Sequence, residues 1–292
     1  MTRRQLFDYA AMSVLWGSSF LVMVKVIAAF GWVGAVTFRA FIASGTLWLF
    51  AKALRRTLNF HIGLRHFAVI GTFTVALQLI GLAFSVPRIG TAMAAIFVAT
   101  IPLFSMIIGQ LWGIEHMTGQ GRLGLALGFV GMVMLVGFPV VAFTTDFWLG
   151  CAASVIGAAS AAFGSNYARK FLQSIDSWTQ TIGAFMFGGL LTLPLITFVP
   201  VPTVPTISDF GYLFLLAMTM SAICYVLYFR MVSELGPTKA ISVEFVVTVI
   251  AVILGAAVLH ERLSGLQVAG SLVILVGCLM VLDLVPRLGR RS

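Results

Sequence analysis

Residues 236–282 read GPTKAISVEFVVTVIAVILGAAVLHERLSGLQVAGSLVILVGCLMVL, two apolar runs joined by a short polar hinge, His-Glu-Arg-Leu-Ser. Residues 90–136 read GTAMAAIFVATIPLFSMIIGQLWGIEHMTGQGRLGLALGFVGMVMLV and have the same organisation. A shift of 146 residues (236 − 90) places the first stretch on the second without a gap. The matched pairs are Gly90 and Gly236, Ala94 and Ala240, Gly109 and Gly255, Glu115 and Glu261, Gly119 and Gly265, Gly124 and Gly270, Gly131 and Gly277, and Met134 and Met280. Hydrophobicity alone does not explain matched glycines and a matched charge, so the chain is predicted to be an internal duplication.

The composition is that of a membrane protein. Apolar residues make up 60% of the 292 residues and charged residues only 9%, and the mean hydropathy is +1.08. A soluble domain carries about 25% charged residues, so this chain has too few charges to cover a surface in water. We therefore expect an all-α integral membrane protein with the lipid bilayer as its main solvent.

Ten apolar stretches of membrane-spanning length divide the chain. A bilayer core about 30 Å thick requires about 20 apolar residues per helix. The predicted spans are residues 8–28, 34–54, 67–87, 91–113, 121–139, 148–169, 178–198, 209–230, 239–259 and 265–285. The first five lie in a predicted half of residues 1–142 and the last five in a half of residues 143–292.

The basic residues predict the orientation. With the N terminus inside, 14 of the 18 Lys and Arg residues fall on the cytoplasmic side; Arg88 and Arg262 fall outside, and Lys25 and Arg39 fall within spans. The cytoplasmic set is Arg3, Arg4, Lys52, Arg55, Arg56, Arg65, Arg122, Arg169, Lys170, Arg230, Lys239, Arg287, Arg290 and Arg291. This excess predicts a multi-pass protein of the plasma (inner) membrane with both termini in the cytoplasm. It also explains the net charge of +9 without a nucleic-acid partner.

The span count predicts how the two halves are related. Each half holds an odd number of helices, so the second half enters the membrane upside down relative to the first. Ten transmembrane helices in two inverted five-helix repeats are therefore predicted, forming one transport domain. Inverted repeats let a protein exchange two equivalent shapes, each open to one side, so alternating access is the expected mechanism.

Several motifs resemble a known family. LWGSSF at residues 15–20 and TFRAFIASGTLWL at residues 37–49 are similar to the opening helix pair of the EamA-type ten-helix exporters of the drug/metabolite transporter superfamily. Residues 101–131 and 249–277 resemble that family's repeated Glu-Arg-Leu-Ser hinge with a downstream glycine. The resemblance covers both halves. It implies an exporter, closest to those of aromatic and other amino acids.

Two positions depart from the family's pattern. Thr248 stands where the second copy usually has proline, although the first copy keeps Pro102, and residues 31–34 lack the proline that commonly precedes the second helix. Pro102 leaves the carbonyl group of Val98 without its helical donor. We therefore expect a kink at Pro102, which makes it a candidate gating element.

Three ionisable residues fall inside predicted spans and are candidates for the transport pathway, because a charge in lipid is costly unless it lines a cavity or has a partner. Lys25 and Arg39 could instead extend to the outer interface, and Arg39 could have a structural partner. Glu244 has a side chain too short to extend in this way. It could bind a substrate amino group, take up a coupling proton, or pair with Lys239 or Arg230.

The two hinge glutamates have a weaker signal. Glu115 and Glu261 lie beside His116 and Arg262, at helix ends near the membrane surface. Helix capping or a local ion pair is the predicted role of both.

The substrate site is predicted near the bilayer midplane, where inverted-repeat transporters bind. Small residues at that depth let helices approach, and aromatic rings beside them can face a flat or apolar substrate. The predicted substrate-binding residues are Trp16, Ser19, Gln78, Phe97, Thr100, Asn166, Tyr167, Tyr225, Glu244 and Thr248. Helix packing is the alternative role for Trp16, and interface anchoring is the alternative for Tyr225.

These patterns predict a secondary transporter that exports small metabolites, above all amino acids including aromatic ones. No G-x-x-x-x-G-K-S/T run is present, so a substrate or ion gradient must drive transport. An exporter of cationic drugs or dyes by proton antiport, with Glu244 as the counter-charge, is the alternative. An enzyme is disfavoured because the four histidines lie at loops and helix ends without metal spacing. We expect a functional monomer with no cofactor and no metal.

Overall fold

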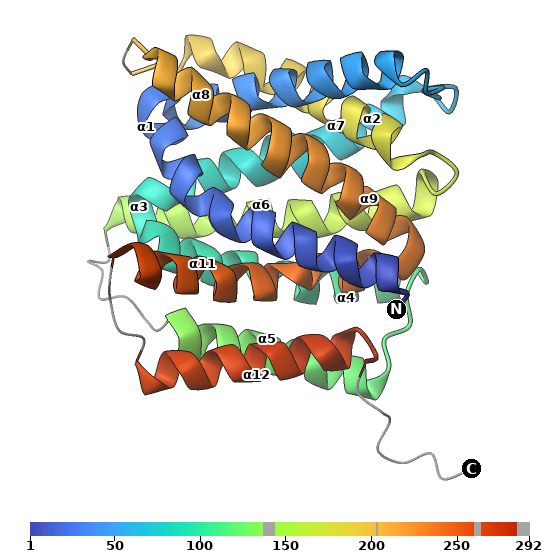
Figure 1. Cartoon of the computed structure of the whole chain (residues 1–292), viewed down its shortest axis with the longest axis vertical. Helices are drawn as coiled ribbons and strands as arrows, with labels where there is room; N and C mark the ends of the chain where they lie inside the picture. The colour runs from blue at the N-terminus through green and yellow to red at the C-terminus, as the bar shows by residue number, and fades with distance from the viewer. Residues whose placement is uncertain (137–143, 203, 260–263, 285–292) are drawn as a thin grey trace.

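The structure, a computed structural model, is a bundle of helices and describes residues 1–136, 144–202, 204–259 and 264–284. The elements are α1 (Arg3–Ala53), α2 (Leu64–Ile70), η1 (Gly71–Leu77), α3 (Gln78–Val98), α4 (Ile101–Leu111), α5 (Gly119–Val136), α6 (Thr145–Phe171), α7 (Ser177–Thr192), η2 (Leu193–Thr197), α8 (Ile207–Leu215), η3 (Leu216–Ile223), α9 (Cys224–Leu235), α10 (Pro237–Ile241), α11 (Val243–Leu259) and α12 (Gly265–Val281). The first turn of α1 and the last turn of α12 lie at the same end of the bundle (Figure 1). We call this the N-terminal end and the other the opposite end.

The predicted spans are helical over most of their described lengths, but two glycines join spans that the sequence separates. α1 contains the first two spans and bends at Gly31, where φ is 71° and ψ is 167°. α3 bends in the same way at Gly90, where φ is 78° and ψ is 160°. A residue with a Cβ is strained at such positive φ values, so glycine makes both reversals possible.

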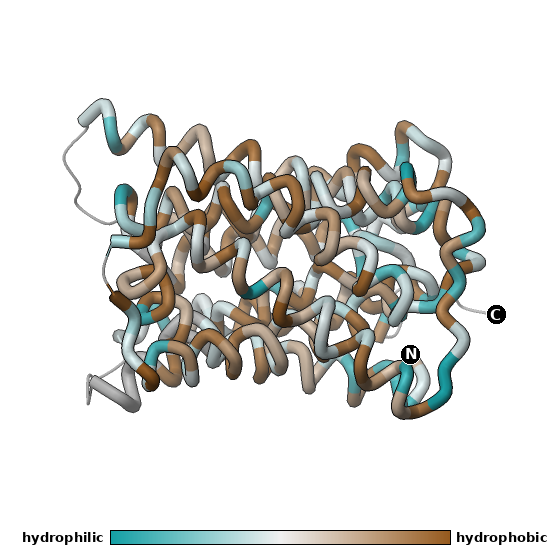
Figure 2. Tube along the Cα trace, turned by 90° about the horizontal axis from the view of Figure 1, so that it is seen from above, coloured by the Kyte–Doolittle hydropathy of each residue, from teal (hydrophilic) through white to brown (hydrophobic). Residues whose placement is uncertain are grey.

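Among the described residues, five helices are long and apolar enough to cross a membrane, judged by length and composition: Val22–Ala53, Leu64–Gly90, Thr145–Phe171, Ser177–Thr197 and Ile207–Leu235. Shorter apolar helices cover Ile96–Leu111, Gly119–Leu135 and Gly265–Val281. Apolar residues occupy the middle of the bundle and hydrophilic residues gather towards its two ends (Figure 2). This distribution is the one that a membrane-spanning bundle requires.

The fourth predicted span is interrupted next to Pro102. α3 ends at Val98, Ala99 and Thr100 are not helical, and Pro102 lies in the first turn of α4. The missing N–H of proline accounts for an interruption at this point. A role of Pro102 in gating stays a prediction.

Four glycines bring α5 and α12 into direct backbone contact. A Cβ added to Gly124 would lie 2.6 Å from the carbonyl oxygen of Gly277, and one added to Gly131 would lie 2.8 Å from that of Gly270. In the 146-residue register Gly124 corresponds to Gly270 and Gly131 to Gly277, so each contact becomes the other when the halves are exchanged. Two inverted repeats related by a twofold axis give this pattern. The predicted boundary at residues 142 and 143 lies outside the described residues and stays a prediction.

Replacing Gly124 with alanine is expected to destabilise the protein by about 1–3 kcal/mol, the usual range for overpacking a tight contact. The thermal midpoint in detergent, followed by loss of the monodisperse peak, measures the effect. Gly119→Ala is the control, because no described atom lies within 4 Å of a Cβ added there. An equal loss in both variants would contradict the close contact.

Two π-helical segments interrupt corresponding spans of the two halves. η1 starts at Gly71 and η3 starts at Leu216, which is 145 residues later (216 − 71). A π-helical turn changes the backbone hydrogen-bond pattern locally and is frequent at functional sites. Both segments lie beside the cavity described next.

Candidate functional site

A small cavity lies inside the bundle between residues of the two halves. Its volume is about 60 Å³. It is lined by Trp16, Ser19, Met23, Arg39, Gln78, Leu79, Leu82, Val98, Tyr225, Glu244 and Val247. A single water requires about 10–15 Å³. The cavity therefore has room for a few waters, and a metabolite could enter only if helices move apart.

Glu244 contributes a carboxyl group to this cavity. It lies in the first turn of α11, and no salt bridge or side-chain hydrogen bond of its carboxylate is present among the described residues. The sequence suggested that Glu244 could pair with Lys239 or Arg230. In the structure these two basic residues pair with other carboxylates, Arg230 with Asp8 and Lys239 with Asp283. The carboxylate of Glu244 is thus available to a ligand.

Arg39 supplies the positive charge. It lies in the second half of α1, its side chain is 7% exposed, and its Nε donates a 2.6 Å hydrogen bond to Oγ of Ser221 in η3. Among the described residues it has no carboxylate within salt-bridge distance. A buried cation without a salt-bridge partner is costly, so a ligand anion beside Arg39 would be stabilising.

Two aromatic side chains of the cavity are fixed by the π-helical segments. The indole Nε1 of Trp16 donates a 2.8 Å hydrogen bond to the carbonyl oxygen of Met220 in η3. The hydroxyl of Tyr225 donates a 3.4 Å bond to the carbonyl oxygen of Thr74 in η1. The changed hydrogen-bond pattern of a π-helical turn leaves carbonyl groups free for such donors.

The rings of Trp16, Tyr225 and Tyr228 contact one another. Their centroids are 5.6 to 5.9 Å apart, with Trp16 edge-on to Tyr225. Tyr225 and Tyr228 are 4% and 3% exposed, so they belong to the core of the bundle and not to an interfacial belt. The sequence had left interface anchoring open for Tyr225, and its burial excludes that role.

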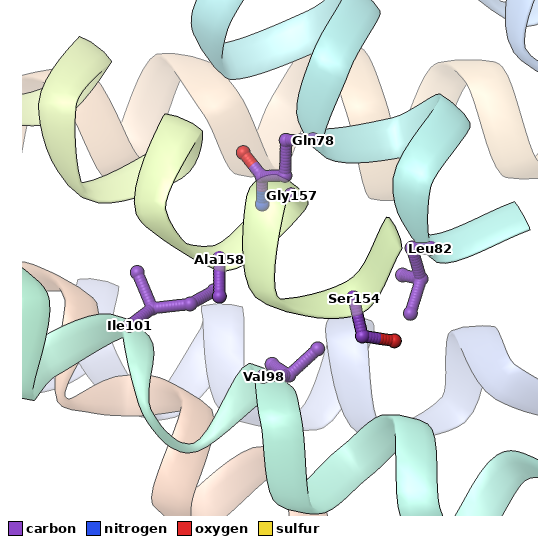
Figure 3. Close-up of a pocket in the computed structure, with 7 residues that line it drawn as sticks. All are labelled: Gln78, Leu82, Val98, Ile101, Ser154, Gly157 and Ala158. Atoms are coloured by element: carbon purple, nitrogen blue, oxygen red, sulfur yellow. The ribbon is translucent and has the colours of Figure 1, made fainter. Parts of the chain in front are cut away.

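Gln78 lines both the main cavity and a side cavity. The side cavity, of about 20 Å³, is lined by Gln78, Leu82, Val98, Ile101, Ser154, Gly157 and Ala158 (Figure 3). The amide group of Gln78 lies beside Gly157 of α6 in this view. No side-chain hydrogen bond of Gln78 is present among the described residues, so its amide also remains available to a ligand.

Six predicted site residues meet at the main cavity: Trp16, Ser19, Arg39, Gln78, Tyr225 and Glu244. The others lie elsewhere. Thr100 bonds the carbonyl oxygen of Phe97 at 2.6 Å, and Thr248 bonds that of Glu244 at 3.1 Å. These local bonds occupy the hydroxyl groups of Thr100 and Thr248. Phe97 does not line the cavity, but it packs in the same apolar cluster as the cavity residues Trp16 and Met23.

Asn166 and Tyr167 lie towards the N-terminal end. The amide nitrogen of Asn166 donates to Ser105 Oγ at 3.0 Å, and the hydroxyl of Tyr167 is 2.9 Å from Nδ1 of His66. Neither residue lines the main cavity. Lys25 is exposed, and its Nζ lies 3.2 Å from the Tyr212 hydroxyl, so it lies at the opposite end of the bundle.

Sequence reasoning missed the partners that position the site. Met220, Ser221 and Thr74 each bind a cavity residue, but they come from segments that read as ordinary apolar helix. η1 and η3 lie at matching positions of the two halves, 145 residues apart. The sequence of these segments gives no signal that predicts a π-helical turn. The hinge residues Glu261 and Arg262, and the basic residues Arg287, Arg290 and Arg291, lie outside the described residues.

Metal ligands do not gather in the part of the chain that the structure describes, where no group of three His, Cys, Asp or Glu residues could hold an ion. The main cavity offers an arginine side chain, a carboxyl group, an amide and two aromatic rings for contacts with a ligand.

Comparison with known proteins agrees with this fold. The uncharacterized inner membrane transporter YedA of Escherichia coli (strain K12) is 28% identical over 181 residues, which is 62% of this chain but only 58% of YedA. Protein PecM of Dickeya dadantii (strain 3937) is 24% identical over 220 residues, 74% of this chain and 73% of PecM. A solved crystal structure covers 97% of this chain and 98% of its own, with a TM-score of 0.80 at 14% identity, which shows a shared fold.

One family matches both halves of the chain. The sequence model of the EamA-like transporter family matches residues 9–137 and again residues 148–283. The two matches together cover most of the 292 residues. Their bounds fall within the two predicted halves. The chain therefore belongs to the EamA-like transporter family.

Proposed function

We propose that the protein is a secondary transporter that exports small zwitterionic metabolites, amino acids including aromatic ones, by alternating access. The observation that carries this proposal is that Arg39 and Glu244 line one cavity and that neither forms a salt bridge among the described residues. An amino acid has both complementary charges. Its carboxylate would bind Arg39 and its ammonium group would bind Glu244.

The remaining cavity residues suit the uncharged part of such a substrate. Trp16 and Tyr225 present aromatic surface from the two halves, and Gln78 offers a free amide. Aromatic pairs in edge-on geometry add about 0.5–1.5 kcal/mol beyond the burial of apolar area. An aromatic amino-acid side chain would therefore gain more from this cavity than a small polar one.

The distribution of charge supports the orientation. Arg3, Arg4, Arg230 and Lys239 lie at the N-terminal end with the N terminus itself. The positive-inside rule places this end in the cytoplasm of an inner membrane. Export from the cytoplasm is the direction implied by the family resemblance.

A transporter of dicationic drugs or dyes is the second candidate, because Glu244 has no partner among the described residues. Arg39 argues against it, since a second positive charge would enter a cavity that already holds one. Like charges placed in a medium of low dielectric constant repel strongly.

Counterflow in proteoliposomes tests the proposal. Vesicles loaded with one unlabelled amino acid at a time are followed for uptake of labelled phenylalanine, labelled threonine and a dicationic dye, with and without a pH gradient. We expect amino-acid exchange, strongest for phenylalanine, and no dye uptake. Protein-free vesicles give the background. Dye uptake without amino-acid exchange would overturn the proposal in favour of the drug exporter.

A further inference from the structure

Several contacts fasten the N-terminal end of the bundle, and each joins the first half to the second. The ion pair of Asp8 with Arg230 is one of them. The others are Gln5 to Glu234 at 2.9 Å, Tyr9 to Ser242 at 3.2 Å, Ser105 to Thr238 at 3.1 Å and Glu115 to the backbone N–H of Thr238 at 3.1 Å. The two halves are therefore joined at this end, and we call this arrangement the closed state.

Glu115 differs from the other members of this set because it is inserted into a turn of the opposite half. Its Oε2 accepts the N–H of Thr238, and its Oε1 occupies the space that a side chain at residue 236 would need. Gly236 has a φ of 92°, so the turn itself also requires glycine. The matching Gly90 has a φ of 78°, but no described atom lies within 4 Å of a Cβ added there.

A second buried group lies beside the carboxyl of Glu115. A Cβ added to Gly109 would be 3.0 Å from Oδ1 of Asn166 and 3.5 Å from Oε2 of Glu115. The amide nitrogen of Asn166 donates to the carbonyl oxygens of Ser105 and Ala162, which fixes the amide orientation. Its Oδ1 is buried and has no hydrogen-bond partner among the described residues. A neutral Glu115, unlike an ionised one, has a proton to donate towards this acceptor.

We propose that Glu115 is the gating residue of the cytoplasmic entrance: its carboxyl group, buried against the turn at Gly236 and Thr238, must leave this site before the path opens to the cytoplasm. The inference rests on the proposed alternating-access transport and names the contact that one of its steps has to break. Opening separates Glu115 from the second half and transfers its carboxyl group to water.

Protonation then favours the closed state. Burial raises the pKa of Glu115 in the closed state, and it outweighs the opposing effects of Thr238, Arg169 on α6 and Lys239 on α10. Tyr228 on α9 also interacts electrostatically with the carboxyl group of Glu115. In water after opening, the pKa falls back towards its usual value. A group with the higher pKa in the closed state stabilises that state at low pH, and this stabilisation is lost as the pH rises.

Thiol labelling tests the gate without any transport measurement. The natural cysteines Cys151, Cys224 and Cys278 are replaced by alanine, and Ala240→Cys, at a position with 0% exposure on α10, serves as the reporter. Maleimide labelling in detergent is divided by labelling of the SDS-unfolded protein at the same pH, which removes the titration of the thiol. We expect the ratio to rise with pH, by at most about tenfold per unit for one proton.

Glu115→Gln retains the acceptor but cannot ionise. We expect its labelling ratio to stay low and to lose most of its dependence on pH. Glu234→Gln is the matched control, because it removes an exposed carboxylate that also bonds across the halves. It should keep the pH dependence of the parent. The same pH dependence in Glu115→Gln as in the parent would overturn the proposal.

A double-mutant cycle tests the contact with the turn. Gly236→Ala displaces Glu115 and strains the turn, whereas Gly90→Ala has a similar positive φ without the described neighbour. We expect faster labelling in Gly236→Ala and in Glu115→Ala than in the parent at pH 6, with little change in Gly90→Ala. The double variant should label no faster than the faster single variant, because both break one contact.

Full additivity of the two substitutions, or equal labelling in Gly236→Ala and Gly90→Ala, would overturn the proposal. Each variant is first checked by size-exclusion chromatography, and only monodisperse protein is labelled. Because no substrate is present, these outcomes are independent of the counterflow experiment. A protein that fails to exchange amino acids but keeps the Glu115-dependent labelling would leave the gate intact and overturn only the proposed substrate class.

Discussion

Replacing Glu244 with glutamine is expected to reduce phenylalanine counterflow by about 10- to 100-fold at substrate concentrations below saturation. The side chain keeps its size, but the ammonium group of the substrate loses its ionic partner in the cavity. Hydrogen bonds to charged groups contribute about 1.5–3 kcal/mol, which corresponds to this range of affinity. The measurement is the concentration dependence of counterflow in proteoliposomes with equal amounts of inserted protein.

Glu234→Gln is the control for this variant, because Glu234 is an exposed carboxylate at the N-terminal end and does not line the cavity. It should change the apparent KM by less than about twofold, since surface charges contribute little. Equal flux in Glu244→Gln and in the parent protein would show that this carboxylate does not bind substrate. A loss that appears only when a pH gradient drives the flux would instead make Glu244 the coupling site.

The second large effect is expected at Arg39. Arg39→Gln removes the positive charge from the cavity while an amide can still bond Ser221, so the helix contact at η3 is kept. The substrate carboxylate would enter the cavity unpaired, and breaking one partner of a buried charge pair costs about 2–5 kcal/mol. We expect the apparent affinity for amino acids to fall by at least about 30-fold.

Arg39→Gln should also change the charge preference of the cavity. With Glu244 unopposed, a primary amine without a carboxylate should compete better in this variant than in the parent protein. Lys25→Gln is the control, because Lys25 is exposed and contacts Tyr212 away from the cavity. If Lys25→Gln and Arg39→Gln gave the same loss of flux, the effect would be one of general surface charge.

The sequence register predicted more of the fold than hydropathy alone could. Matching residues 90–136 to residues 236–282 identified glycines that the structure then uses in equivalent ways. Gly90 and Gly236 both adopt positive φ, and Gly124 contacts Gly277 as Gly131 contacts Gly270. Glycine is informative because it is required only where backbone approaches closely or turns sharply. Positions that pack by shape alone leave no comparable signal.

The sequence predicted the site residues that are ionisable, because burying a charge in an apolar span is costly. Arg39 and Glu244 stood out because an ionisable residue within an apolar span needs a reason, and both line the main cavity. Depth along a helix was a poorer guide. Asn166 and Tyr167 were assigned to the midplane, but their bonds to Ser105 and His66 belong to the N-terminal end. Side-chain direction around the helix axis is not contained in the span boundaries.

Contacts between residues far apart in the chain were not predictable from one sequence. The bond from Trp16 to Met220 joins residues 204 positions apart, and that from Tyr225 to Thr74 joins residues 151 apart. The hinge position of Glu115 indicated capping, and it does bond a backbone N–H at a helix start. That this N–H belongs to the other half could be learned only from the structure.

In the proposed alternating-access cycle, the closed N-terminal end and the cavity of about 60 Å³ correspond to one state. A cavity of this size does not hold an amino acid, so binding requires the helices of the two halves to separate. The contacts across the halves at the N-terminal end are those that must break on one side of the cycle.

The central claim is that one cavity binds both charges of a zwitterion, and competition with matched analogues tests it most directly. Counterflow of labelled phenylalanine is measured in the presence of phenylalanine, phenethylamine or 3-phenylpropionate, which share the ring but carry both charges, only the ammonium or only the carboxylate. We predict that phenylalanine competes at least about tenfold more strongly than either analogue, because each analogue leaves Arg39 or Glu244 unpaired. Competition by phenethylamine or 3-phenylpropionate as strong as that by phenylalanine would contradict the claim.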